Sequence, residues 1–433
     1  MNLKNKKVLV YGLAKSGLAA VNLLLRSGAE VYVCDDNGII VPENTTAVTD
    51  ASFSKECDLV VLSPAVPVGK PELREAVKRG IVIGETELAS DFLDSELIAV
   101  TGTNGKTTVT LMITDILNGA GERAYALGNI GIPLSEKVGK LSPSDVAVTE
   151  VSSFQLETIK RFSPDAAVLT NVTSDHLDRH GSAENYAKIK ARIFENQIPR
   201  DIAVINADDE TSVKISEGVK SDLFFFSKNK KVRGTYLEDG EIYFSDSRRI
   251  HIASCGELSA CAGFNLENAL AATTVCMARG VHPEIIRKSL KSFVSPPYRM
   301  TYLGEKRGKK FYNDSKGTNV SATLASAKCL SENTVLILGG RSKGENFGYL
   351  FEKLPKNVVH VFVTGENSRE IMDGALSAGF YGITYRRTLS ECVKESVLVH
   401  ADNVLFSPAS SSFDRYADYA ARGKAFDELF CDL

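Results

Sequence analysis

The run Gly102-Thr103-Asn104-Gly105-Lys106-Thr107-Thr108 combines two glycines, a lysine and hydroxyl groups in one short stretch. Backbone N–H groups of such a loop can surround phosphate oxygens, because glycine has no Cβ to obstruct the approach. Lys106 can reach the outer phosphates, and the hydroxyl of Thr107 can hold Mg²⁺. Val100 stands where the common loop has its first glycine, and the alternative is a capping turn with a surface lysine. We predict that the loop binds a nucleotide phosphate.

A carboxylate and an imidazole follow two later apolar runs. Glu150 comes directly after residues 146–149, and His176 lies shortly after residues 166–170. Both side chains suit a divalent ion beside a triphosphate. A lone histidine is as often a structural residue, so position alone leaves both interpretations open for His176. Lys190 lies among other charges on a helical segment and by itself is typical of a solvated surface.

The elements on either side of the first loop favour phosphate binding. Residues 97–100 are apolar and predict a buried strand. Val109, Met112, Ile113 and Ile116 recur at helical spacing after the loop. A strand, a glycine-rich loop and a helix N-terminus are the setting in which such loops bind phosphate.

A second glycine loop lies near the N-terminus. Residues 7–11 predict a strand, 12–17 a glycine loop, 18–26 a helix and 31–34 a strand that ends at Asp35. This is the layout of a dinucleotide-binding fold. Ala14 replaces the middle glycine, and its methyl group crowds the place of a pyrophosphate. We therefore expect a nucleotide-like ligand other than NAD, with Ser63 either touching it or forming a proline-rich turn.

The length of 433 residues predicts two or three domains. We place them at 1–93, Rossmann-like; 94–296, around the phosphate-binding loop; and 297–433, again Rossmann-like. The whole is an α/β protein. Short β runs between 222 and 255, with a hairpin turn at Asp239-Gly240, predict a small antiparallel appendix on the central domain. Polar, glycine-bearing loops in the third domain predict a second ligand surface.

Composition narrows the classes of function. Lys and Arg number 51 against 54 Asp and Glu, so no basic footprint for nucleic acid is present. No apolar run approaches the ~18 residues of a membrane helix, and the polar start does not resemble a signal peptide. The eight cysteines are scattered, without a Cys-x-x-Cys pair, which favours free thiols. We expect a cytoplasmic protein that binds neither nucleic acid nor membrane.

Six ordered motifs between residues 8 and 425 resemble the Mur ligase family, the ATP-dependent amide ligases that build the peptide of peptidoglycan. They are the loop 102–107, Glu150-Val151-Ser152-Ser153-Phe154-Gln155-Leu156, Asp175-His176-Leu177-Asp178, Asn265-x-x-Asn268-Ala269, Tyr298-Arg299 and Asp314-Ser315-Lys316-Gly317-Thr318-Asn319. Within the family, the first glycine loop, Ser63-Pro64 and Ser407-Pro408-Ala409 imply UDP-N-acetylmuramoyl-L-alanine and D-glutamate as substrates. The implied reaction forms an acyl phosphate and a tetrahedral intermediate, and releases ADP and phosphate.

The resemblance also implies roles for individual residues. The implied catalytic residues are Lys106, Lys190, His176 and Lys316. The implied ATP contacts are Gly102, Thr103, Asn104, Gly105, Lys106, Thr107, Thr108, Asn268, Arg299 and Asp314. The UDP-sugar contacts would be Ser16, Asp35, Ser63, Asn129, Ser152, Gln155 and His176, and those to the amino acid Lys316, Thr318, Lys343, Ser412 and Tyr419. Two Mg²⁺ ions would be held by Thr107, Glu150, His176 and Lys190.

Lys190 would act as a carbamate, which turns a cation into a two-oxygen anion and replaces the surface interpretation given above. Phe413 and Tyr419 depart from the leucine and phenylalanine expected in other members, which bears on amino-acid selectivity. The chain is expected to be a monomer.

Three alternatives remain at this point. A folate polyglutamate ligase shares the central and third domains, but such enzymes usually start near the phosphate-binding loop, whereas here a glycine-loop α/β unit precedes it. The interpretation as a nicotinamide-dependent oxidoreductase rests on that first unit alone and leaves the loop at 102–107 unexplained. A non-catalytic nucleotide switch predicts no ATP turnover.

Overall fold

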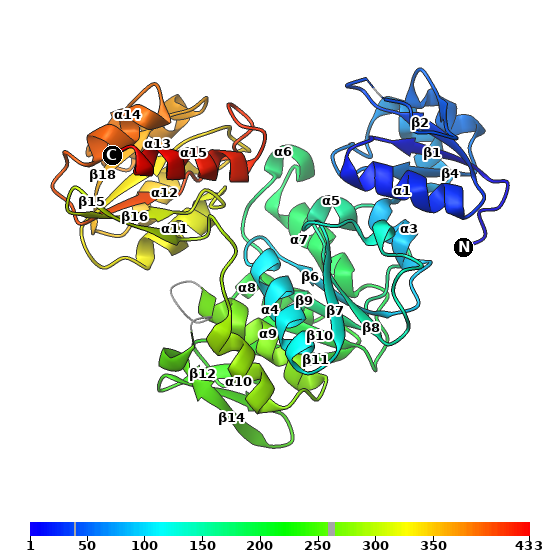
Figure 1. The fold of residues 1–433 in the computed structure, drawn as a ribbon, viewed down its shortest axis with the longest axis horizontal. Helices are drawn as coiled ribbons and strands as arrows, with labels where there is room; N and C mark the ends of the chain where they lie inside the picture. The colour runs from blue at the N-terminus through cyan, green and yellow to red at the C-terminus, as the bar shows by residue number, and fades with distance from the viewer. Residues whose placement is uncertain (39, 259–264) are drawn as a thin grey trace. The chain divides into compact units, whose positions relative to one another are not determined.

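The computed structural model describes residues 1–38, 40–258 and 265–433, so Cys261 lies outside the described residues. Three β-sheets, each covered by helices, follow one another along the chain (Figure 1). This arrangement confirms the predicted α/β class with Rossmann-like first and third parts. The domain boundaries remain predictions.

The first sheet is parallel, in the order β3-β2-β1-β4-β5. Val8 and Val10 of β1 pack on the side of α1 and α3, whereas Leu9 and Tyr11 pack on the opposite side. Both faces are covered, which is why the strands are continuously apolar. α1 begins three residues before the predicted helix, so Ser16 lies in its first turn. The elements are β1 (Lys7–Tyr11), α1 (Lys15–Arg26), β2 (Glu30–Cys34), β3 (Thr46–Ala47), β4 (Leu59–Leu62), α2 (Arg74–Lys78), β5 (Val82–Gly84) and α3 (Glu85–Ser90).

The central sheet has nine strands in the order β14-β13-β12-β11-β10-β9-β6-β8-β7. Its strands are β6 (Glu96–Thr101), β7 (Arg123–Gly128), β8 (Asp145–Glu150), β9 (Ala166–Leu169), β10 (Ile202–Asn206), β11 (Asp222–Ser227), β12 (Gly234–Glu238), β13 (Glu241–Ser245) and β14 (Arg249–Ser254). Its helices are α4 (Lys106–Gly119), α5 (Ser153–Leu156), α7 (Ala183–Ala191), α8 (Glu210–Ser216), α9 (Leu266–Ala278) and α10 (Pro283–Ser292).

The predicted antiparallel appendix is a continuation of this sheet. β11 pairs parallel to β10, with Ile202 opposite Asp222, and also parallel to β12. Antiparallel pairing in this part of the sheet is found between β12 and β13 and between β13 and β14. β11 joins the main sheet because Phe224 and Phe226 enter the core on the face covered by α9. The hairpin at Asp239-Gly240 is confirmed, with both residues at positive φ and Glu238 paired with Glu241.

The first two sheets share one apolar core. Side chains of β1 and β4 belong to the same buried cluster as Ala99, Ala147 and Ala167 of the central sheet. α3 reinforces this junction, because the Glu87 carboxylate accepts the backbone N–H groups of residues 160–162 at 2.9, 2.9 and 3.0 Å. The opposite face of the central sheet is covered by α4, α9 and α10 (Figure 1).

The third sheet has the order β15-β16-β20-β17-β18-β19, and only β15 is antiparallel to its neighbour. Its strands are β15 (Thr301–Lys306), β16 (Lys309–Asn313), β17 (Thr334–Leu338), β18 (Val358–Val363), β19 (Ile383–Tyr385) and β20 (Asn403–Phe406). Its helices are α11 (Val320–Lys328), α12 (Phe347–Lys353), α13 (Ser368–Ser377), α14 (Leu389–Ser396) and α15 (Tyr419–Cys431).

The chain divides into two compact units. The first contains Met1–Val172, residues 184–258 and Asn265–Phe293, and the second contains Thr173–Ala183 and Val294–Leu433. The short segment with His176 and α6 (Leu177–His180) therefore packs with the third sheet, although it lies between two central strands in sequence. Within the described ranges, no helix is both long and apolar enough to cross a bilayer.

Candidate functional site

The phosphate-binding loop lies where β6 ends, between the ends of β9 and β8. Gly102 has φ 147° and Gly105 has φ 85°. A Cβ at Gly102 would overlap the Thr170 hydroxyl, and one at Gly105 would overlap the Asn268 amide oxygen. The loop therefore needs glycine at both positions. It also brings Asn268, predicted to contact ATP, against Gly105.

Residues after β9 fix the shape of the loop. The N–H of Thr103 donates to Asn171 O at 2.8 Å, and the N–H of Asn104 donates to Asn171 Oδ1 at 2.9 Å. Lys106 Nζ donates to the carbonyls of Gly102 and Thr103, both at 2.8 Å. Thr108 is fully buried in the first turn of α4. The lysine thus lies directly over the loop that it is predicted to serve.

Thr107 and Glu150 form the centre of the candidate metal site. Thr107 Oγ1 donates to Glu150 Oε2 at 2.6 Å, and Asn129 Nδ2 donates to Glu150 Oε1 at 2.9 Å. Glu150 is 2% exposed. A hydroxyl and a buried carboxylate side by side at a helix N-terminus are the oxygen ligands that Mg²⁺ prefers. These residues therefore fit the predicted ion.

Lys190 is buried, whereas its neighbours in the sequence are typical of a solvated surface. It lies near the end of α7 with only 1% of its area exposed. Its Nζ donates to Gly102 O at 2.8 Å and lies 4.6 Å from the centre of the Tyr186 ring. The hydroxyl of Tyr186 in turn is 3.3 Å from Thr103 Oγ1. Lys190 thus belongs to the wall of the phosphate-binding loop.

The first glycine loop gathers three residues predicted to bind the UDP-sugar. Ser16 Oγ and Ser63 Oγ are 3.3 Å apart, and Asp35 accepts the N–H of Leu13 at 2.7 Å. Lys15 Nζ donates to the carbonyl of Gly131, which places this loop next to the loop that carries Asn129. Ser16 at the start of α1 and Ser63 and Asn129 on neighbouring loops therefore lie close together in the first unit.

Ser152 and Gln155 form a capping box at the start of α5. Gln155 N donates to Ser152 Oγ at 3.3 Å, and Ser152 N donates to Gln155 Oε1 at 2.9 Å. Gln155 Nε2 also donates to Thr86 Oγ1 at 2.9 Å, across the junction of the first two sheets. Their local role is thus structural, and contact with a sugar ligand remains a prediction.

The second unit carries the residues predicted for the amino acid. Lys316 Nζ lies 3.7 Å from the centre of the Tyr419 ring, and Thr318 N donates to Lys316 O at 2.8 Å. Ser412 is 3% exposed in the loop after β20. The loops after β16, β17 and β20 leave adjacent strand ends, where α/β sheets bind ligands.

Asp314, predicted to contact ATP, is a buried carboxylate of the second unit. Burial raises its pKa to about 6, and hydrogen bonds from the Ser326 and Ser407 hydroxyls, at 2.6 and 2.7 Å, oppose that rise. Met300 N donates to Asp314 Oδ1 at 3.3 Å, and the Arg299 charge also lowers the Asp314 pKa.

Asp175 holds the His176 segment to the third sheet. Its carboxylate accepts Lys343 Nζ at 2.8 Å and Asn319 Nδ2 at 3.1 Å. Burial alone would raise the pKa of Asp175, but the neighbouring cation Lys343 brings it down to about 2. His176 itself has φ 52° and follows this carboxylate directly. Thr107, Glu150 and Lys190 belong to the first unit and His176 to the second, and a metal site shared by the four residues remains a prediction.

Several residues of these sites were missed by the sequence reasoning. Asn171 and Tyr186 contact the phosphate-binding loop, and nothing in their spacing distinguishes them from ordinary loop and helix residues. At the first sheet, Tyr11 donates to Asp36 at 2.6 Å while Lys70 pairs with the same carboxylate at 2.6 Å. Asp36 directly follows Asp35, so its position at a strand end was a usable signal.

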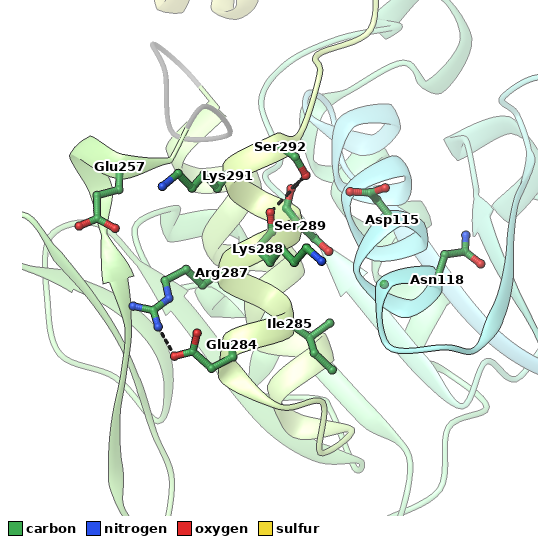
Figure 2. Close-up of a pocket in the computed structure, with 11 residues that line it drawn as sticks. Asp115, Asn118, Glu257, Glu284, Ile285, Arg287, Lys288, Ser289, Lys291 and Ser292 are labelled. Carbon is green, nitrogen blue, oxygen red and sulfur yellow. Dashed lines mark hydrogen bonds and ion pairs between the residues drawn. The ribbon is translucent and has the colours of Figure 1, made fainter.

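A groove of about 770 Å³ lies between α10 and the end of α4 (Figure 2). Asp115 of α4 faces Lys288 and Ser289 of α10, and Arg287 on the same helix pairs with Glu284. Asn118 lines the end of the groove, but its amide is bonded to the backbone of Ala124. No residue predicted for ATP, sugar, amino acid or metal lines it. We therefore place the candidate site at the strand ends and not in this groove.

Comparisons with known proteins agree with this geometry. The chain matches the MurD-like N-terminal domain of Mur ligases over residues 6–84, the Mur ligase middle domain over 100–276 and the glutamate ligase domain over 298–410. Together these matches span most of the chain, each on one of the three sheets. The protein belongs to the Mur ligase family, which confirms the resemblance seen in its motifs.

Two relatives of similar length have the same enzyme name. The UDP-N-acetylmuramoylalanine–D-glutamate ligases of Koribacter versatilis and Pelotomaculum thermopropionicum are each 39% identical, over 99% of this chain and 98% of theirs. Among solved structures, MurF from Acinetobacter baumannii aligns with a TM-score of 0.63 at 16% identity, over 100% of this chain and 91% of that one. MurC from Thermotoga maritima gives 0.59 at 22%, over 99% and 100%. These two structures support the fold.

Proposed function

We propose that this protein is a UDP-N-acetylmuramoylalanine–D-glutamate ligase, which uses ATP to join D-glutamate to UDP-N-acetylmuramoyl-L-alanine and releases ADP and phosphate. The full-length relatives carry this name. The observation that carries the proposal is the contact of Thr107 with Glu150 at the end of a glycine-bearing loop. A site of this kind suits a nucleotide and its metal, which a simple dinucleotide-binding oxidoreductase would not need.

The chemistry starts from a carboxylate, whose negative charge repels an attacking amine. Transfer of the γ-phosphoryl group of ATP to the substrate carboxylate gives an acyl phosphate. The amine of D-glutamate attacks it, and phosphate leaves from a tetrahedral intermediate. This transfer depends on positioning and charge neutralisation. Lys106 and the loop N–H groups supply them, and each well-aimed donor typically contributes roughly 3 kcal/mol.

Mg²⁺ would neutralise charge on the phosphates when bound. In this proposal two ions would be held by Thr107, Glu150, His176 and a carbamate on Lys190. The burial of Lys190 beside Gly102 supports this role, because a carbamate there would face the phosphate loop. Thr107 and Glu150 supply oxygen ligands to one ion.

The remaining predicted residues keep their proposed roles. The first sheet would bind the UDP-sugar through Ser16 at the start of α1 and through Asp35 and Ser63 on neighbouring loops. The second unit would bind D-glutamate and part of the nucleotide. A cytoplasmic, monomeric enzyme without nucleic-acid or membrane partners belongs to the same proposal, since its substrates are soluble metabolites.

Phosphate release with UDP-N-acetylmuramoyl-L-alanine and a panel of amino acids tests the function. D-Glutamate is expected to give the highest rate, with ADP and the amide product formed in equal amounts. Phosphate release that does not depend on the sugar substrate would contradict the proposal. Hydride transfer with NAD would favour the oxidoreductase alternative.

The role of Lys190 is tested by Lys190→Ala, with Lys188→Ala as the control on the same helix. Lys188 is exposed and pairs with Glu184, which is exposed as well. We expect Lys190→Ala to abolish turnover and short carboxylic acids to restore part of it, because they can replace the carbamate oxygens. Near-normal activity of Lys190→Ala, or equal loss in both variants, would remove the carbamate role.

A further inference from the structure

Arg422 is a buried cation in the first turn of α15. It is 2% exposed, and its guanidinium donates only to neutral oxygens. Nε and Nη2 donate to Ser315 Oγ at 3.1 Å and Ser315 O at 2.9 Å, and Nη1 donates to the carbonyls of Ser410 and Ser411 at 3.0 and 3.1 Å. Within the described ranges, no carboxylate lies within ion-pair distance of it. Burial lowers the pKa of Arg422 to about 10.

The residues bonded to Arg422 directly precede proposed amino-acid contacts. Ser315 comes before Lys316, and Ser411 comes before Ser412. Ser315 Oγ also donates to the carbonyl of Tyr419 at 2.8 Å. One guanidinium therefore joins the loop after β16, the loop after β20 and the beginning of α15.

The loop after β17 is attached to the same assembly. Arg341 N donates to Ser411 O at 2.9 Å, and Ser411 N donates to Arg341 O at 3.0 Å. Lys343 follows two residues later. The three loops proposed to hold the amino acid are thus connected through Ser411 and Arg422.

We propose that Arg422 is a specificity-determining and positioning residue, which holds these loops in place and supplies an unpaired positive charge beneath them. This inference rests on the proposed function. A buried cation without a carboxylate partner is costly to a fold. In a low-dielectric setting its field acts strongly on a nearby anion. The arrangement therefore favours an amino acid with an anionic side chain over a neutral one of the same shape.

Lys309 is a matched buried cation in the same sheet. It is 6% exposed, and its Nζ donates to the carbonyls of Val399 and Ala401 at 2.6 and 2.7 Å. These contacts are at the start of β16 and β20, whereas Ser315 and Ser411 follow the ends of those strands. Lys309 thus stabilises the sheet at the edge remote from the three loops.

The test compares Arg422→Gln, Arg422→Lys and Lys309→Met in the full chain. Steady-state assays give kcat and the KM values for D-glutamate, D-glutamine and ATP, and thermal unfolding reports folding. We expect Arg422→Gln to raise the KM for D-glutamate and to lower the preference for D-glutamate over D-glutamine, each about tenfold, with the ATP KM nearly unchanged. Arg422→Lys should keep the preference, because it keeps the charge. Lys309→Met should lower stability without changing the preference.

An unchanged preference in Arg422→Gln would overturn the inference, as would an equal rise in the KM for ATP. If that variant does not fold, Asp414→Asn gives the second test, because the Asp414 charge opposes that of Arg422. Asp414→Asn should lower the KM for D-glutamate about twofold, and an unchanged or higher value overturns the inference. Absence of turnover with D-glutamate in the wild type would instead refute the proposed function.

Discussion

The buried carboxylate of Asp314 makes the stability of the protein depend on pH. Asp314 is 4% exposed, and burial raises its pKa from its ordinary value of 3.8 to about 6. The folded state therefore binds a proton more tightly than the unfolded state does. Stability is lost as the pH rises from about 4 to about 6, and stays constant above that range.

Asp314→Asn should remove this pH dependence, because the amide does not ionise. Relative to the variant, the wild type is expected to lose about 3 kcal/mol of unfolding free energy between pH 4 and pH 7. Urea unfolding of both proteins at several pH values measures the difference. Asp402→Asn, an exposed change before β20, serves as the control. A wild-type curve parallel to that of Asp314→Asn would show that Asp314 is ionised throughout.

The residue types in the phosphate-binding loop predicted its chemistry, but they did not predict which side chains around the loop are buried. Glycines, Lys106, Thr107 and Glu150 could be assigned because phosphate and Mg²⁺ binding demands those groups at strand ends. The burial of Lys190 could not be predicted from its charged neighbours, because it depends on a contact with Gly102, 88 residues away. Arg422 was missed for the same reason, since its partners lie in other loops.

Helix α3 attaches the first sheet to the central sheet. Glu87 is 1% exposed and accepts three successive backbone N–H groups, of Lys160, Arg161 and Phe162. Glu85 on the same helix accepts Ser135 N at 2.6 Å. Two carboxylates of one short helix thus fix the first sheet against the central one.

Glu87→Ala should therefore destabilise the first unit by about 3 kcal/mol or more, because three buried N–H groups lose their acceptor. Glu87→Gln keeps one acceptor oxygen and should lose less. Chemical denaturation measures both, with Glu75→Ala, an exposed glutamate on α2, as the control. The KM for the UDP-sugar should also rise in Glu87→Ala. Equal stability of the Glu87 and Glu75 variants would mean that solvent replaces the lost acceptor.

Long apolar runs predicted strands, whereas very short strands and strands of mixed polarity were missed. β1 and β6 are buried on both faces, so an apolar run marks each of them. β15 contains exposed positions and lacks such a run, and β5 is only three residues long. The parallel pairing of β11 was also missed, because a short run between turns reads equally well as part of a hairpin.

The chain folds as two compact units, and the segments that make up each unit are not continuous in the sequence. Residues 173–183 join the second unit because Asp175 pairs with Lys343 and Asn319. No sequence pattern marks this pairing, since its partners are more than a hundred residues apart. The family resemblance indicated three domains, whereas which segments pack together depended on individual contacts.

Two cations with carboxylate partners, one in each unit, allow the units to be destabilised separately. In the first, Arg279 donates to Glu96 at 2.7 and 2.6 Å and to Glu122 at 3.3 and 3.0 Å. In the second, Lys343 pairs with Asp175. The two cations are matched, with side chains 12% and 13% exposed.

Calorimetry of Arg279→Met and Lys343→Met is expected to show two transitions that respond independently. Lys343→Met should lower one transition by about 2 to 4 kcal/mol, because it leaves the buried Asp175 carboxylate uncompensated. Arg279→Met should lower the other by about 1 kcal/mol, because Glu96 and Glu122 are each 32% exposed and water can solvate them. A non-hydrolysable ATP analogue should raise the transition affected by Arg279→Met, since the phosphate-binding loop belongs to that unit. A single common transition that both variants shift equally would contradict this prediction, because it would show that the two units unfold as one cooperative body. The segment with His176 would then not unfold with the second unit alone.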